Sequence, residues 1–290
     1  MTPTRLDESE WRELQRAHAA RVAPWVTPRL ERRQQGQRHP VEDFLFDYYS
    51  WRPAQLARWH PGSGVLLTGD VREFAAVKGY AIGTDGAVVD PASLPRDLMS
   101  ATLHLLEATD TRAPSFGCFG RHEWAMVYRE APDEIRHATW PLRLSPADIA
   151  AVVEATPLRC THFDAFRFYT QPARPLNIVQ PSRETQADLE QPGCLHATMD
   201  LYKWCFRSYP AVGADLTADC FALAHEVREI DMRASPYDFG ELGYAPIPIE
   251  SVEGRAEYVE HQRDFAARGS VLRTRLIAQL RTVLEPTAVA

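Results

Sequence analysis

The chain has 290 residues, of which 45% are hydrophobic, so it is long and apolar enough to bury a large core in one or two domains. Its formal net charge of −7, from 32 basic and 39 acidic residues, excludes a global basic surface and argues against strong nonspecific binding to nucleic acid. No run of 18 apolar residues occurs and the N-terminus is charged from Arg5 onward, so we expect neither a membrane span nor a signal peptide.

The five cysteines are odd in number and form no CxxC pair. This pattern favours reduced thiols in the core of a cytoplasmic protein over a disulfide framework or a zinc ribbon.

The first fifty residues predict two helices. Residues 7–22 form an amphipathic helix capped by Asp7 or Ser9, which we expect to be exposed and peripheral. Residues 39–51 form a second helix, rich in aromatic side chains, with Pro40 at its first position. Glu42 projects between two of the aromatics, so it is either a buried carboxylate or an acid that complements the helix dipole.

A small β element is predicted next. Residues 80–90 form a hairpin that turns at Asp85-Gly86. Two further strands, 141–144 and 159–169, flank a helix over residues 145–156. In the second of these strands, His162 and Asp164 share one face and Arg167 lies on the other.

Helices are also predicted over residues 95–107 and 121–129. The first turn of the second one holds His122 and Glu123. Adjacent residues on a helix point about 100° apart. The two side chains therefore do not suit one metal ion together, although either could contribute a ligand.

The chain is predicted to be organised around a helix over residues 193–208. Most of its circumference is apolar, which is typical of a helix in the middle of a domain. Its charged and imidazole side chains fall in one arc about 60° wide, which either faces solvent or lines a polar pocket. The members of this arc are His196, Asp200, Lys203 and Arg207. The preceding connector, residues 170–192, has little periodicity, and we expect it to cover the site that contains His196.

The last helices are predicted over residues 216–232, 253–267 and 270–284, with a break at Gly269. Asp231 falls within the apolar arc of the first of them. Because a buried, unpaired carboxylate is costly, Asp231 requires a partner such as Arg233 or a histidine.

Together these elements predict a mainly α-helical fold (α+β with a small β element). We expect a single domain over residues 1–290, packed around the helix at 193–208, with the helix at 7–22 at its periphery.

Five ionisable residues lie in elements that are otherwise apolar: His162, Asp164, His196, Asp200 and Asp231. Because buried charges persist only when they pair with one another or with a metal, we predict that these residues converge in one pocket. The predicted metal ligands are His162, Asp164, His196 and Asp231, with His122, Glu123 and Glu42 as alternates. The predicted catalytic groups are His196, Asp200, Asp231, Arg167 and Lys203. The opposing interpretation is that His162–Asp164 and His196–Asp200 are separate, locally satisfied pairs.

Histidine and carboxylate ligands suit iron, which we favour among the metals. His162 and Asp164, followed by a distal His225, match the ligand order of Fe(II)/2-oxoglutarate oxygenases, with Arg233 and Ser235 placed to bind 2-oxoglutarate.

A helical bundle with ligands from several helices fits the predicted helical content better. Its Glu-x-x-His signature occurs once, at Glu134 and His137. A metal-free acid–base site is a further alternative, with Asp231 or Asp164 as base and His196 or His162 as acid.

Five segments of the chain together resemble a known group of proteins. These segments are residues 39–51, 117–129, 161–168, 191–204 and 231–238. They resemble bacterial proteins labelled 3-methyladenine DNA glycosylase, and the resemblance extends from about Arg29 to Arg281. It implies hydrolysis of the N-glycosidic bond of an alkylated purine, with the base flipped out of the DNA duplex. It assigns no catalytic residue to a position in this chain.

We therefore favour a metal-dependent enzyme of the non-haem iron oxidase or oxygenase type that acts on a small polar molecule. The alternatives are a DNA-repair N-glycosylase, whose partner would be DNA, and a non-catalytic ligand-binding protein. Metal content distinguishes the first from the others, and salt-sensitive binding to abasic-site DNA would favour the second.

Overall fold

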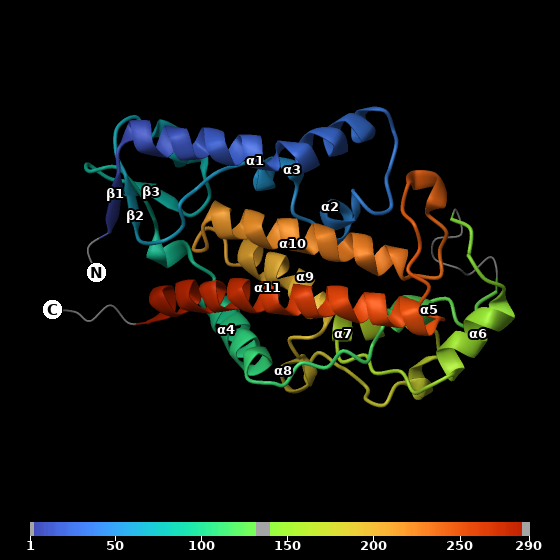
Figure 1. The fold of residues 1–290 in the computed structure, drawn as a ribbon. Helices are drawn as coiled ribbons and strands as arrows, with labels where there is room; N and C mark the ends of the chain where they lie inside the picture. The colour runs from blue at the N-terminus through green and yellow to red at the C-terminus, as the bar shows by residue number, and fades with distance from the viewer. Residues whose placement is uncertain (1–2, 132–139, 286–290) are drawn as a thin grey trace. The chain divides into compact units, whose positions relative to one another are not determined.

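A computed structural model describes residues 3–131 and 140–285 (Figure 1). The chain folds into two compact units, the first comprising Met1–Leu106, Asp200–His225 and Val271–Ala290, and the second comprising Glu107–Met199 and Glu226–Ser270. Four helices, α4 (Arg96–Asp110), α9 (Leu195–Arg207), α10 (Ala214–Arg233) and α11 (Val252–Leu284), contribute residues to both units. The single domain stays a prediction. The mainly helical fold with a small β element is confirmed for the described residues.

The β element belongs to the first unit and is a four-stranded sheet in the order β1-β2-β4-β3. Its strands are β1 (Thr4–Leu6), β2 (Val65–Leu67), β3 (Tyr80–Ile82) and β4 (Ala87–Val89), and they lie beside the start of α1 (Figure 1). Strands β1 and β2 are parallel, and the other pairs are antiparallel. The predicted hairpin is confirmed as β3–β4. Gly86 is required in its turn because a Cβ there would lie 1.9 Å from the carbonyl oxygen of Leu67.

Helix α1 (Glu8–Gln34) is longer and better packed than predicted. It begins with a capping box formed by Asp7 and Glu10, and it continues through Pro24 and Pro28. Trp11 is fully buried and donates a hydrogen bond from Nε1 to the carbonyl oxygen of Thr68, 3.0 Å away. Two of the three residues on its predicted apolar side, Trp11 and Val22, are buried, whereas Leu14 is 39% exposed, and α1 supplies part of the core of the first unit.

The stretch predicted as one helix over residues 39–51 contains only the short α2 (Phe44–Tyr48), and α3 (Pro53–Leu56) follows it. The buried carboxylate of this stretch is Asp43 and not Glu42. Asp43 accepts hydrogen bonds from Arg29 and Arg32. Two 3₁₀ helices, η1 (Arg72–Ala76) and η2 (Pro91–Ser93), lie between this region and α4.

The second unit contains short helices and long connections. Its helices are α5 (Arg121–Ala125), α6 (Pro146–Glu154), α7 (Phe163–Phe166), η3 (Arg174–Leu176), α8 (Gln186–Leu189) and η4 (Gly240–Leu242). The strands predicted over residues 141–144 and 159–169 are wrong. The first is a single bridge between Leu142 and Tyr237, and the second contains α7. The alternation of side chains over residues 159–169 does not indicate a strand, because aromatic residues occupy both of the predicted faces.

Helix α9 has the predicted buried character, because Met199, Tyr202 and Trp204 are all buried. Phe206 is only half-buried and stacks against the Trp51 ring, with centroids 5.2 Å apart. The predicted break at Gly269 is wrong, since α11 runs through it without interruption. That glycine instead permits a close approach within the second unit: a Cβ at Gly269 would lie 3.0 Å from Cγ2 of Thr198.

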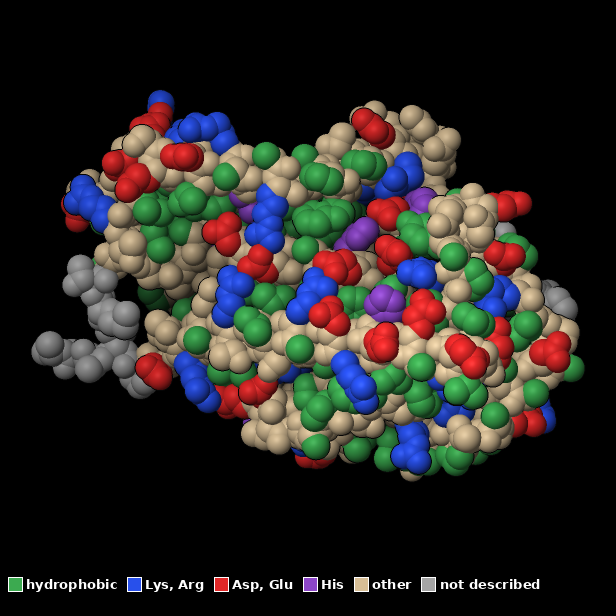
Figure 2. Space-filling view, viewed as in Figure 1, with side chains coloured by type: hydrophobic (Ala, Val, Ile, Leu, Met, Phe, Trp, Pro, Cys, Tyr) green, Lys and Arg blue, Asp and Glu red, His purple; other side chains and the backbone are tan. Residues whose placement is uncertain are grey.

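Three further observations bear on the predictions from composition. Within residues 3–131 and 140–285, no helix combines the length and apolar character that crossing a bilayer requires. All five cysteines are free thiols. On the face that Figure 2 shows, acidic and basic side chains are interspersed, without one large area of a single sign.

Truncation of Trp204 tests the importance of α9 to the core. Its side chain is 8% exposed, and Trp204→Ala should lower the free energy of unfolding by roughly 3–5 kcal/mol in a denaturant titration. Val271→Ala is the control, because that side chain is 61% exposed and its loss should change the value by less than about 0.5 kcal/mol. A loss below about 1 kcal/mol for Trp204→Ala would contradict the central position of α9.

Gly269 provides a second test. Replacing a glycine inside a helix by alanine usually stabilises the helix by about 1 kcal/mol. Here we expect Gly269→Ala to be destabilising, because the new methyl group meets Thr198. In a Thr198→Ala background the same change should become stabilising by roughly 0.5–1 kcal/mol, as measured in a double-mutant cycle. Equal effects in both backgrounds would show that the contact does not constrain α11.

Candidate functional site

Three ionisable side chains meet within the second unit. His122 lies on α5, His196 lies in the first turn of α9, and Asp231 lies near the end of α10. One ring nitrogen from each histidine and one carboxylate oxygen of Asp231 all lie within 4.8 Å of one another. We call these three residues the His₂Asp group.

A close contact in the His₂Asp group joins His122 to Asp231. Nε2 of His122 lies 3.2 Å from Oδ2 and 3.1 Å from Oδ1 of the carboxylate. The two residues are only 2% and 0% exposed, so water screens this interaction very little. Only Oδ2 meets hydrogen-bond geometry with Nε2 of His122; Oδ1 has no hydrogen-bond partner within the described residues and remains available to a further donor or ion.

The protonation states follow from this contact. Burial acts to lower the pKa of His122, but the negative charge of Asp231 and the hydrogen bonds to Asp231 and Cys118 outweigh it and hold that pKa well above its usual value. Burial acts to raise the pKa of Asp231, but the charge and hydrogen bond of His122 outweigh it and lower the pKa to about 2. Without a metal, the pair is therefore an imidazolium and a carboxylate at neutral pH.

Two further buried charges surround this pair. Nη1 of Arg228 lies 3.9 Å from Oδ2 of Asp231 and 3.4 Å from Oε1 of Glu123. Arg228 is one turn before Asp231 on α10, and Glu123 directly follows His122 on α5. The two helices thus each supply one carboxylate to a shared guanidinium.

His196 lies between two other imidazoles. Its ring centroid is 4.4 Å from that of His122, in an edge-on arrangement, and 5.2 Å from that of His162, in a stacked arrangement. Nε2 of His162 lies 3.2 Å from Oε1 of Glu190, which is also buried. The site therefore has three histidine rings in succession, with a carboxylate beside each outer ring.

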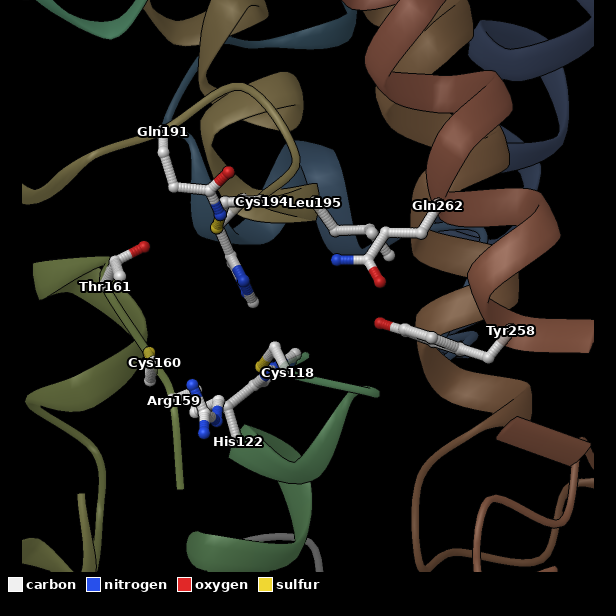
Figure 3. A pocket seen from close by; sticks show the side chains of 11 residues that line it. Cys118, His122, Arg159, Cys160, Thr161, Gln191, Cys194, Leu195, Tyr258 and Gln262 are labelled. Carbon is white, nitrogen blue, oxygen red and sulfur yellow. Dashed lines mark hydrogen bonds between the residues drawn. The ribbon is translucent and has the colours of Figure 1, made fainter. Parts of the chain in front are cut away.

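A small cavity lies against the His₂Asp group. It has a volume of about 10 Å³, room for about one water-sized species, and its lining includes Cys118, His122 and His196. Tyr258 and Gln262, from α11, face Cys118 and His122 across it (Figure 3). Oε1 of Gln262 is buried and accepts no hydrogen bond within the described residues, so it adds an acceptor to the wall.

The backbone before α5 holds His122 in place. Gly120 has a φ of +68°, and a Cβ there would lie 3.2 Å from the hydroxyl oxygen of Tyr258. The next residue, Arg121, donates hydrogen bonds of 2.7 and 2.9 Å to the carbonyl oxygens of Thr156 and Pro157. The position of the imidazole is thus fixed by contacts on both sides of the turn.

The connector over residues 170–192 contributes to the site at its end. Asn177 fixes its middle by accepting a hydrogen bond from the backbone N–H of Cys160 and donating one to the carbonyl oxygen of the same residue. Glu190 then contacts His162, and Gln191 lines the cavity. The segment is therefore ordered against residues that flank the site.

The predicted set of site residues is only partly brought together. His162, His196 and Asp231 converge, and the alternate ligand His122 joins them. Asp164 is not part of this group: its carboxylate lies 3.1 Å from Nε of Arg167 on the same turn, and Arg167 is exposed.

Other predicted residues belong to the first unit. Asp200 accepts a hydrogen bond of 2.8 Å from the hydroxyl of Tyr49 and forms an ion pair with Lys203. Glu42 contacts Nε2 of His225 at 2.9 Å, so the third ligand of the oxygenase pattern has a local carboxylate partner. Glu134 and His137 lie outside the described residues.

Four residues of the site were missed from the sequence. Arg228 could have been identified, since it is three residues before Asp231 on the same helix. Cys118 is four residues before His122, so its contact with that imidazole is also local. Glu190 and Tyr258 carry no local signal, because their roles arise from contacts between distant segments.

No protein-family model matches the chain, and comparisons with curated proteins and with solved structures find no match either. The geometry of the described residues is therefore the basis for any functional proposal.

The ionisation of the pair predicts a pH dependence of stability when no metal ion is bound. The pKa of Asp231 lies below its usual 3.8, so its contribution is complete above that pH and is lost as the pH falls towards 2. The pKa of His122 lies above its usual 6.5, so its contribution is complete below that pH and is lost as the pH rises through the raised pKa.

We therefore expect Asp231→Asn to destabilise the protein most between about pH 4 and pH 6.5, by roughly 3–5 kcal/mol in urea unfolding with chelator present. Asp164→Asn, which alters a pair whose Arg167 side chain is exposed, is the control and should change the stability by less than about 1 kcal/mol. A difference for Asp231→Asn that stays constant from about pH 3 to pH 9 would contradict the proposed ionisation.

Proposed function

We propose that the chain is a metal-dependent enzyme whose ion, expected to be iron, is bound by His122, His196 and Asp231. The observation that supports this proposal is the convergence of the three potential ligand atoms within 4.8 Å of one another. Two histidines and one carboxylate are the ligand set typical of non-haem Fe(II) oxygenases.

The geometry and charge of the group fit a divalent ion. Ligand atoms that lie about 2.0–2.2 Å from one ion are at most about 4.4 Å apart, so small side-chain rotations suffice. Asp231 and Glu123 provide two negative charges against the single positive charge of Arg228. Replacing the proton of His122 by a divalent ion changes the sum of these buried charges from 0 to +1, so the two carboxylates compensate most of the added charge.

The surrounding residues define what the site can accept. Bound iron would supply Lewis acidity and one-electron chemistry. The cavity of about 10 Å³ is far smaller than the roughly 300–1,000 Å³ of pockets that enclose organic ligands. Tyr258 and Gln262 offer a hydroxyl group and an amide oxygen on its wall. These features favour a small polar reactant next to the metal ligands.

Metal analysis tests the proposal directly. Protein purified without chelators should contain about one iron atom per chain, measured by elemental analysis. His196→Gln and Asp231→Asn should each lower the metal content at least about ten-fold. Asp164→Asn is the matched control, because it removes a carboxylate predicted from the sequence that lies outside the His₂Asp group, and its metal content should be unchanged.

Two outcomes would contradict the proposal. One is full metal content in folded His196→Gln protein. The other is a wild-type protein that contains no metal and takes up neither iron, manganese nor zinc in titration. Thermal unfolding of each variant verifies that a loss of metal does not reflect a loss of fold.

A second candidate function is supported by Cys118. Its sulfur lies 3.8 Å from Nδ1 of His122, whose other nitrogen contacts Asp231, which gives the order of a nucleophile, a base and an orienting acid. Burial acts to raise the pKa of Cys118, but His122 outweighs it and lowers that pKa. Such a site would perform metal-free nucleophilic catalysis, and loss of activity in Cys118→Ser with unchanged metal content would favour it.

The remaining alternatives are a DNA-repair N-glycosylase and a non-catalytic ligand-binding protein. The resemblance of residues 39–51 and 191–204 supports the first, whereas the small cavity and the net charge of −7 oppose it. Release of 3-methyladenine from alkylated DNA by protein without metal would establish it. For cellular location we propose the cytoplasm, supported by the five free cysteines.

A further inference from the structure

A groove in the first unit differs in chemistry from the His₂Asp group. Its volume is about 460 Å³, within the range of pockets that bind small molecules. Its lining residues come from within 51–58 around α3, from 76–79 at the end of η1, from 93–95, and from 206–210 at the end of α9. None of the ligands of the proposed metal ion lines it.

All the charged side chains in this groove are basic. Arg58, Lys78 and Arg207 come from three separate segments, and no aspartate or glutamate lines the groove. Within the described residues, none of the three forms an ion pair with a carboxylate. Three like charges around one concave surface create a local positive potential that attracts anions, although the whole chain carries a net charge of −7.

The remaining wall is aromatic. The rings of Trp51 and Phe206 are stacked, with an interplanar angle of 17°, and the Tyr209 ring lies 5.5 Å from that of Trp51. Such rings offer flat apolar surface at little conformational cost. Gly79 completes the wall, and a Cβ there would lie 2.7 Å from Cγ of Pro210, so the backbone at this point is tightly packed.

We propose that this groove binds a small organic anion that carries both an aromatic ring and a doubly charged group, most simply a phosphate monoester. The three basic side chains bind the charged group, with Arg58 and Arg207 suited to bidentate contacts with its oxygens. The ring packs against Trp51, Phe206 and Tyr209. An inorganic anion would leave the aromatic wall exposed, and a neutral ring would leave the cations uncompensated.

The experiment uses the full chain and three probes in isothermal titration calorimetry. The probes are 1-naphthyl phosphate, which has ring and charge, 1-naphthol, which has the ring alone, and inorganic phosphate, which has the charge alone. We expect the first to bind at least about ten-fold more tightly than either of the others. Its affinity should fall between about 50 mM and about 500 mM salt, because exposed charges become screened.

Charge-removing variants assign the binding to the groove. The triple variant Arg58→Gln, Lys78→Gln and Arg207→Gln should weaken 1-naphthyl phosphate binding at least about ten-fold. The matched control removes the same charge from exposed positions of the first unit outside the groove, through Arg5→Gln, Arg16→Gln and Arg33→Gln, and should change the affinity by less than about two-fold.

Four results would overturn the proposal: no binding of 1-naphthyl phosphate at millimolar concentration, affinity equal to that of either simpler probe, equal weakening by both triple variants, or tighter binding of oligodeoxythymidylate than of the monoester. Since no ligand of the proposed metal ion lines the groove, these results are independent of the metal content of the protein.

Discussion

Burial of the charged contact between His122 and Asp231 is the constraint on which the second unit depends. A carboxylate that is 0% exposed is tolerated only with compensating charge and hydrogen bonds, so α5, α10 and the start of α9 must meet at one point. Arg228 and Glu123 extend the compensation along the same two helices. The left-handed turn at Gly120 and the hydrogen bonds of Arg121 then place the imidazole of His122 against the carboxylate of Asp231.

The fold could be predicted where local pattern decided the structure. The apolar circumference of α9 and the Asp85-Gly86 turn each specify an element without help from distant residues. The predictions from sequence failed where tertiary contacts determine the bounds or the type of an element. The predicted helix ends at residue 22, yet α1 continues through Pro24 and Pro28, and Trp11, Val22 and Val26 are buried on one side of it. Strand β1 was not recognised because its three residues gain their partners from Val65–Leu67, 61 positions later.

The site shows the same division. Asp231 was recognised as a carboxylate in an apolar arc that needed a partner, and a histidine was among the partners expected. That the histidine is His122 could not be known, because 109 positions separate the two residues and no local rule pairs them. Asp164 was misassigned because the alternation of residues 161–169 suggested a strand that points it and His162 together. In α7 it instead pairs with Arg167, one turn away.

The two nitrogens of His122 connect the ion pair to the proposed metal. In the metal-free state both carry protons, with Nε2 directed at Asp231 and Nδ1 at Cys118. A metal requires a lone pair on the nitrogen that faces Asp231, so its binding must release the Nε2 proton. Cys118 then fixes the remaining proton on Nδ1, which selects the tautomer that presents Nε2 to the ion. Metal affinity should therefore rise with pH as long as the raised pKa of His122 has not been passed, and Cys118→Ala should weaken metal binding without removing a ligand. If Cys118 is instead a nucleophile, metal affinity in Cys118→Ala should be unchanged.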